Sequence, residues 1–400
     1  MKPSSARPSP LSRRSLLAGS AATALLMLPG CGCCCDGGSA VVGIGGTGSF
    51  TSGPIRGFGS IVVNGVRYDD AAAQVVGDGG AALARSDLRL GMVVDVSGSD
   101  VSTATDGRRS ATATSIGVRS EIEGPVSAIN AAAGTLTVLG QLVQITPTTV
   151  FDDDLRGGLA AVAVGMVVEV YGFLQPSGQY LATRIDDEDD PVTHYKLRGV
   201  VSGLDTAART FRIGTALVSY ADIAASVSGL ANGQLTPDAS GAWRARSIRL
   251  ATTAIGMPAG DGVKAEIEGY ITAFTSDARF SVAGIVVDAS AVGQLPPGLA
   301  VGRRVEVEGV LSGGVLVARS VEFEDDDDDD DDEFEIEGVI TSVSASARTF
   351  SVRGITVNYA NARFKDGTAE QLAPGVKVEV EGQLASDGTT LLATEVEFDN

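Results

Sequence analysis

The sequence predicts an all-β protein built from about five tandem small barrels, of which the third is incomplete. A glycine-marked motif recurs five times along 400 residues. Each recurrence is followed by short runs in which apolar and polar residues alternate, which is typical of strands with one buried face. Glycine is abundant, with 51 residues, whereas aromatic residues make up 5%. Many turns and few bulky side chains favour many short strands around small cores.

The N-terminal segment has the pattern of a bacterial export signal. Arg13 and Arg14 form a twin-arginine pair. The apolar stretch that follows, residues 16–28, is too short for a bilayer, which needs about 20 residues, but it suits a signal peptide. Residues 28–31 then resemble a lipobox, although Pro29 is unusual there, and Cys31 is the predicted lipidation site. A cleaved secretory peptide without lipid is the alternative.

The four cysteines all lie within residues 31–35, so the body of the protein needs no disulfide in an oxidising compartment. Their spacing matches no standard zinc site and no histidine is nearby, so we predict no metal there. We therefore expect residues 1–30 to be the signal peptide and residues 31–52 to be a Cys/Gly-rich flexible tether.

Three glycines mark the repeated unit. The first ends motifs such as Glu-Ile-Glu-Gly, at residues 57, 124, 199, 269 and 338. The second separates two β-branched runs, at residues 65, 140, 214, 284 and 354, and predicts hairpins; Asn64-Gly65 is a type I′ signal. The third ends the alternating strand Val-Glu-Val-Glu-Gly at 302–309 and 375–382, with looser copies at 91–98 and 165–172.

The order of strands within one unit favours an OB-type barrel. Five strands are expected, with a connector before the fourth, such as residues 367–374, that has room for one helical turn. Closure of the barrel also leaves few free Val-rich edges. A small sandwich or an SH3-like barrel is the alternative. Copy three lacks the alternating fourth strand after residue 235, and is expected to be incomplete or completed by a neighbour.

These patterns give the following domain boundaries: copy one at 53–119, copy two at 120–187, an acidic linker at 188–194, copy three at 195–250, copy four at 265–323, a poly-Asp linker at 324–333, and copy five at 334–400.

Residues 53–69 resemble a family of bacterial envelope domains of unknown function that occur as tandem repeats in predicted lipoproteins. The Val-Glu-Val-Glu-Gly strand is similar to that family as well. The resemblance implies small β-barrel modules and a location in the cell envelope. It implies no catalytic residues.

Few residues in the sequence could perform catalysis. His194 is the single histidine, and its place in a linker predicts an exposed side chain rather than part of a triad or metal site. The single Trp243 is expected to pack or anchor rather than stack on a ligand. We therefore predict no catalytic residues. A hydrolase with paired carboxylates would need a cleft that a barrel of about 60 residues hardly provides.

Acidic runs are the most distinctive feature of the composition. Without residues 1–30, 26 basic residues face 50 acidic ones, a net charge of −24, so nucleic acid is excluded as a partner. The longest run joins copies four and five and is expected to be a solvated spacer. Its aspartates are candidate Ca²⁺ ligands in an alternative hypothesis, without the spacing of a calcium loop: Asp325, Asp326, Asp327, Asp328, Asp329, Asp330, Asp331 and Asp332.

The glutamates of the first and fourth strands should face outward and lie opposite one another. In the OB order these strands are neighbours, which brings Glu266 and Glu268 near Glu306 and Glu308. Like charges across a strand pair are destabilising. We therefore expect nearby Arg or Lys, bound cations or solvent spacing to offset them.

Together these features predict an exported lipoprotein that is anchored to a membrane by its N-terminal lipid and faces the periplasm or the cell surface. Its expected role is non-enzymatic binding or spacing without a cofactor. An unknown envelope protein or a polysaccharide is the expected partner. The alternative is a Ca²⁺-responsive envelope protein that uses its acidic linkers and outward glutamates.

Overall fold

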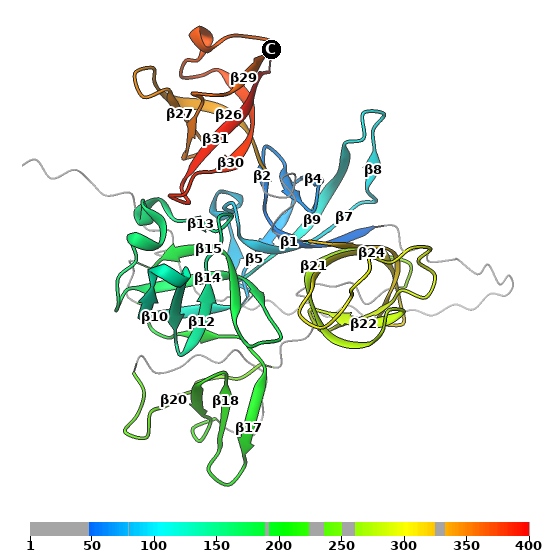
Figure 1. Cartoon of the computed structure of the whole chain (residues 1–400), viewed down its shortest axis with the longest axis vertical. Coiled ribbons are helices and arrows are strands. Elements are labelled where there is room, and N and C mark those ends of the chain that lie inside the picture. Colours follow the sequence, from blue (N-terminus) through cyan, green and yellow to red (C-terminus); the bar gives the residue numbers. More distant parts are fainter. Residues whose placement is uncertain are drawn as a thin grey trace, which may run out of the picture. The chain divides into compact units, whose positions relative to one another are not determined.

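A computed structural model describes residues 48–78, 80–188, 192–223, 236–249, 261–324 and 333–399. These residues form β-strands joined by turns and short 3₁₀ helices, which confirms the all-β prediction (Figure 1). They belong to one compact unit, residues 46–400. Within the described ranges, no helix has the length and apolar character needed to cross a bilayer.

Copy four is a closed five-stranded barrel. The ring runs β21–β22–β23–β25–β24 and returns to β21, with β23 and β25 parallel and the other pairs antiparallel. This is the strand order of an OB-type barrel. The inward positions of the alternating strands, such as Val305 and Val307, are fully buried. Its strands are β21 Lys264–Ser276, β22 Arg279–Val282, β23 Ile285–Asp288, β24 Arg304–Ser312 and β25 Val315–Phe323.

Copy five closes by the same pairings. The predicted helical turn in the connector is present as the 3₁₀ helix η5. The elements are β26 Glu333–Ser344, β27 Thr349–Val352, β28 Ile355–Asn358, β29 Arg363–Lys365, η5 Ala369–Gln371, β30 Lys377–Leu384 and β31 Thr390–Phe398.

Copy two also closes, through β10–β11–β12–β15–β14 and back to β10. The elements are β10 Ile122–Asn130, η2 Ala131–Ala133, β11 Thr135–Val138, β12 Gln141–Gln144, β13 Val150–Phe151, η3 Asp153–Leu155, η4 Gly158–Ala160, β14 Val167–Leu174 and β15 Tyr180–Asp187.

Copy one has the same ring, but its first strand is broken into β1 and β2. The strand β1 begins at Ser49, within the stretch that we expected to be tether. The elements are β1 Ser49–Pro54, β2 Gly57–Phe58, β3 Ile61–Val63, β4 Val66–Asp69, β5 Gln74–Val76, β6 Ala82–Leu83, η1 Arg85–Asp87, β7 Val93–Gly98, β8 Ser102–Thr103 and β9 Arg109–Arg119.

Copy three has no closed ring among its described residues, in line with the incomplete third copy. The strands β17, β18, β19 and β20 form an open four-stranded sheet, and β16 pairs with β10 of copy two. The strands are β16 Lys196–Leu197, β17 Val201–Asp205, β18 Thr210–Ile213, β19 Ala216–Ser219 and β20 Ala242–Arg244.

Two kinds of glycine have clear structural reasons. At the predicted type I′ hairpin, Asn64 and Gly65 have φ of 48° and 66°, a conformation that Asn and Gly tolerate best. The glycine that follows the Val-Glu-Val-Glu run lies within the fourth strand, at a bulge where the fifth strand passes close by. A Cβ on Gly309 would lie 2.8 Å from the carbonyl carbon of Val317, well inside normal contact.

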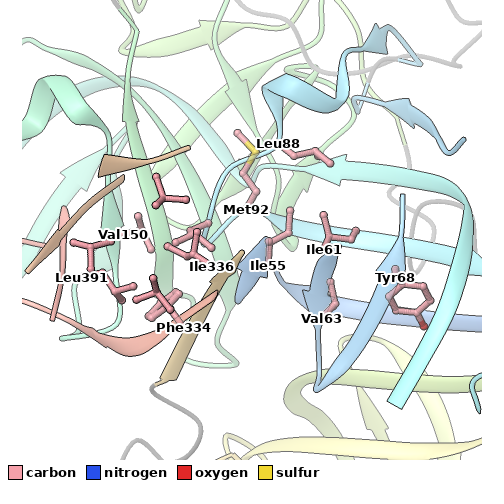
Figure 2. Close-up of a cluster of buried hydrophobic side chains, with 14 of the residues drawn as sticks. Ile55, Ile61, Val63, Tyr68, Leu88, Met92, Val150, Phe334, Ile336 and Leu391 are labelled. Carbon is pink, nitrogen blue, oxygen red and sulfur yellow. The ribbon is translucent and has the colours of Figure 1, made fainter. Parts of the chain in front are cut away.

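Strands from other copies cover the first strand of each closed barrel. β1 runs parallel to the start of β21, β2 runs parallel to β26, and β16 runs antiparallel to β10. Each pairing satisfies backbone groups that closure alone leaves at an edge. Copies one and five also share a hydrophobic cluster, which contains Ile55 and Ile61 together with Phe334 and Ile336 (Figure 2). Neighbouring copies are therefore joined by strand pairing, and copies one and five also by shared hydrophobic packing.

Candidate functional site

The closed copies carry rows of carboxylates across their first, fourth and fifth strands, and we call these the carboxylate rows. In copy four, Glu266 lies opposite Glu308, and Glu306 lies between Glu268 and Glu322. The predicted juxtaposition of the first and fourth strands is confirmed. Copy five repeats it in the rows Glu335–Glu381–Glu395 and Glu337–Glu379–Glu397, and copy two has the row Glu123–Glu169–Asp186.

These glutamates point away from the barrel interior, as predicted, but several are buried. Glu266 and Glu268 are 3% and 5% exposed because other parts of the chain cover them. An isolated buried carboxylate is costly unless a cation or a proton neutralises it. The rows must therefore be neutralised within the folded protein.

In copy four, two carboxylates are paired with arginines and a third is protonated. Arg109, from copy one, donates to Glu266, with Nη1 3.3 Å from Oε1. Arg304 donates from Nε to Glu268 at 2.8 Å. Burial, reinforced by the charges of Glu266, Glu324 and Glu268, raises the pKa of Glu306 to about 10. Glu306 is therefore protonated at neutral pH.

In copy two, hydrogen bonds from hydroxyl groups and nearby cations together stabilise the buried carboxylates. Ser120 and Tyr171 donate to Glu169 at 2.5 and 2.8 Å, and Lys196 lies 3.6 Å from the same carboxylate. At the end of the row, burial raises the pKa of Asp186 to about 7, although Arg184 opposes the shift. This row therefore changes its protonation close to neutral pH.

In copy five the cations come from the same copy and from copy one. Arg363 donates from Nε to Glu395 at 2.9 Å, and Arg67 donates to Glu379 at 2.5 Å. Burial opposes the charge on Glu395, yet hydrogen bonds from Lys365 and Arg363 hold its pKa below the usual value. Here the carboxylate stays ionised because it is directly paired.

Two cavities are relevant to binding. The first, of about 240 Å³, gathers six glutamates from copies four and five and the ends of the poly-Asp linker, with Arg56 of copy one: Glu268, Glu306, Glu324, Glu333, Glu335 and Glu381. Among the described residues, no three His, Cys, Asp or Glu side chains are arranged to hold a metal ion.

The second cavity, of about 540 Å³, lies against copies two, three and four and the last residue of copy one, Arg119. Its wall includes Phe173, Pro176 and Gln175 on and beside the loop that joins the fourth and fifth strands of copy two. Tyr270 of copy four accepts a hydrogen bond from Nε2 of Gln175 at 3.1 Å. The charged groups in the wall are paired, since Glu121 lies 3.6 Å from Arg119. The wall of the cavity is therefore mostly apolar and partly aromatic, and its charged groups are Arg119, Arg198 and Glu121.

Most residues singled out in the sequence lie outside the described ranges. These are Arg13, Arg14, Cys31 and the eight aspartates 325–332. Of the others, His194 is half-buried with Nδ1 3.0 Å from the hydroxyl of Thr193, and Trp243 packs edge-on against Tyr195. The carboxylate row of copy two was missed because its fourth strand reads Val-Glu-Val-Tyr-Gly, with one glutamate instead of two. The partners Arg109 and Arg67 come from another copy, and no local pattern indicates them.

Comparison with protein families shows three copies of one domain. A family described as a domain of unknown function, DUF5666, matches residues 123–186, 268–322 and 337–397. The matched segments correspond to the barrels of copies two, four and five. No curated protein matches the chain significantly.

Proposed function

We propose that this protein, with its three DUF5666 domains, is an exported and lipid-anchored envelope protein that binds an envelope polysaccharide without catalysis. The sequence of residues 1–35 supports the export and the anchor at Cys31. The predicted flexible tether would connect the barrels to the membrane.

The cavity of about 540 Å³ is the observation that carries the binding role. Its volume falls in the range of small-molecule sites, about 300–1,000 Å³. It lies at the loop between the fourth and fifth strands, which OB folds use for oligonucleotides and oligosaccharides. The net charge of −20 repels nucleic acid, whereas a neutral, hydroxyl-rich sugar fits tyrosine and glutamine side chains.

Calorimetry with oligosaccharides released from the bacterial envelope tests the binding role. The double variant Gln175→Ala, Tyr270→Ala should bind at least about 10-fold more weakly, a loss of about 1.4 kcal/mol. Gln179→Ala is the matched control, because it lies in the same loop but not in the cavity wall. Absence of binding heat with every envelope glycan, or equal affinity of all variants, would refute this role.

Fractionation of cells tests the anchor separately. Cys31→Ser should move the protein from the membrane to the soluble periplasmic fraction, while Cys33→Ser should leave it in the membrane. Equal distribution of the two variants would show that Cys31 carries no lipid.

The alternative role, divalent-cation binding, has support from the cavity lined by six glutamates. Titration of CaCl₂ into the protein should then release more heat than a KCl titration of equal ionic strength. Equal heats would exclude this alternative.

A further inference from the structure

Among its described residues, copy three shows no counterpart of the fourth strand of copies two, four and five. In those barrels the first strand pairs with the second strand on one edge and with the fourth strand on the other. In copy three, β17 pairs with β18, and among the described residues no strand pairs with its other edge. Within the part of copy three that the structure describes, this edge of β17 has no partner strand (Figure 1).

The exposure of Val201 shows the effect of the unpaired edge on the core of copy three. Val201 lies opposite Ile213, just as Ile271 lies opposite Val282 and Ile340 lies opposite Val352. Ile271 and Ile340 are 0% and 1% exposed, whereas Val201 is 49% exposed. A residue that belongs to the core of a closed barrel is thus left uncovered in copy three.

Backbone hydrogen bonds in copies four and five show which strand would cover Val201. The N–H groups of Ile271 and Ile340 donate to Arg303 and Val376, each at 2.8 Å, where the fourth strand begins. Val201 holds the same place in copy three. Between residues 220 and 262 the sequence contains no Val-Glu-Val-Glu-Gly run, and its acidic residues are isolated: Asp222, Asp238 and Asp261. This stretch does not encode a fourth strand of the usual pattern.

The charges along the open edge fit a strand of that pattern. In copy four the outward residues of the first strand are Glu266 and Glu268, which oppose Glu308 and Glu306. The equivalent residues of copy three are Lys196 and Arg198. They already contact Asp78, at 2.6 and 3.0 Å. A fourth strand would place two carboxylates opposite these two cations, which replaces repulsion across the strand pair by attraction.

We propose that copy three is completed by a strand donated by a different protein. The donor is an extended segment that alternates apolar and acidic residues and runs antiparallel to residues 196–201. Its apolar side chains cover Leu197 and Val201, and its carboxylates face Lys196 and Arg198. Main-chain hydrogen bonds supply affinity and the alternation supplies specificity, as in other cases of strand addition.

A peptide taken from the chain itself is the probe. The labelled peptide of residues 375–382, Gly-Val-Lys-Val-Glu-Val-Glu-Gly, is titrated into residues 31–400 carrying Cys31→Ser, and binding is followed by fluorescence anisotropy. We expect saturable binding. A peptide with lysine in place of both glutamates should bind at least about 10-fold more weakly.

Two variants locate the binding site. Val201→Asp places a charge on the uncovered core position and should abolish peptide binding. Val164→Asp, at an exposed site of copy two, should leave it unchanged, and circular dichroism verifies that both variants fold. Absence of saturable binding, equal affinity for the lysine peptide, or binding that survives Val201→Asp would overturn the proposal. A dimer in sedimentation that Val201→Asp dissociates would also overturn it, because a second copy would then occupy the edge.

Discussion

Gly309→Ala tests the reason for the glycine at the bulge of the fourth strand. The added Cβ would lie 2.8 Å from the carbonyl carbon of Val317 and 2.9 Å from the Cα of Ala318. Normal contact between carbon atoms is about 3.5–4.0 Å, so β24 and β25 must move apart by roughly 1 Å at their bulge. Overpacking of this kind costs about 1–3 kcal/mol, and the lower chain entropy of alanine offsets about 0.5–1 kcal/mol.

A net loss of about 1.4 kcal/mol makes local opening of copy four roughly 10-fold more frequent. Hydrogen exchange, followed by mass spectrometry over residues 304–323, should show faster exchange by about that factor. Gly293→Ala is the matched control in the same copy, because no atom lies within 4 Å of its added Cβ and its φ is not positive. If both variants exchange at the same rate, the bulge does not require glycine and the steric argument is wrong.

Three further predictions concern copy four. Glu306→Gln should be more stable than wild type in urea at pH 8 and equal to it at pH 4. The raised pKa of Glu306 means that wild type loses stability as pH rises from about 4.5 towards 10, and an unchanged pH profile would contradict this. Arg304→Met leaves the buried Glu268 without its partner and should cost about 3 kcal/mol in thermal unfolding, whereas the exposed Arg319→Met should cost little. Ala283→Asn relieves a φ of 49° and should stabilise the hairpin by about 1 kcal/mol; a lower melting temperature would argue against it.

Local patterns in the sequence determine most of the barrel architecture. Alternation in Val-Glu-Val-Glu-Gly sets which face of β24 is buried, and the spacing of glycines sets the hairpins and the bulge. The strand order then follows, because short antiparallel connections and one connector leave few ways to close five strands. The facing pairs Glu266–Glu308 and Glu268–Glu306 could be derived from this order.

The candidate site could not be predicted from local sequence patterns. The cavity beside Gln175 and Tyr270 joins residues 95 positions apart, in copies that do not follow one another directly. The pKa of Glu306 depends on burial by neighbouring parts of the chain, and no feature of the strand itself reveals that burial.

The amino-acid sequence by itself determined the all-β class of fold and the recurrence of one small barrel along the chain, because each is encoded by residues close together in the chain. Tertiary structure decided which cations neutralise the carboxylate rows, which edges of the barrels are covered by other copies, and how exposed Val201 is. These features depend on contacts between distant segments, where packing and charge, rather than local periodicity, select the partner.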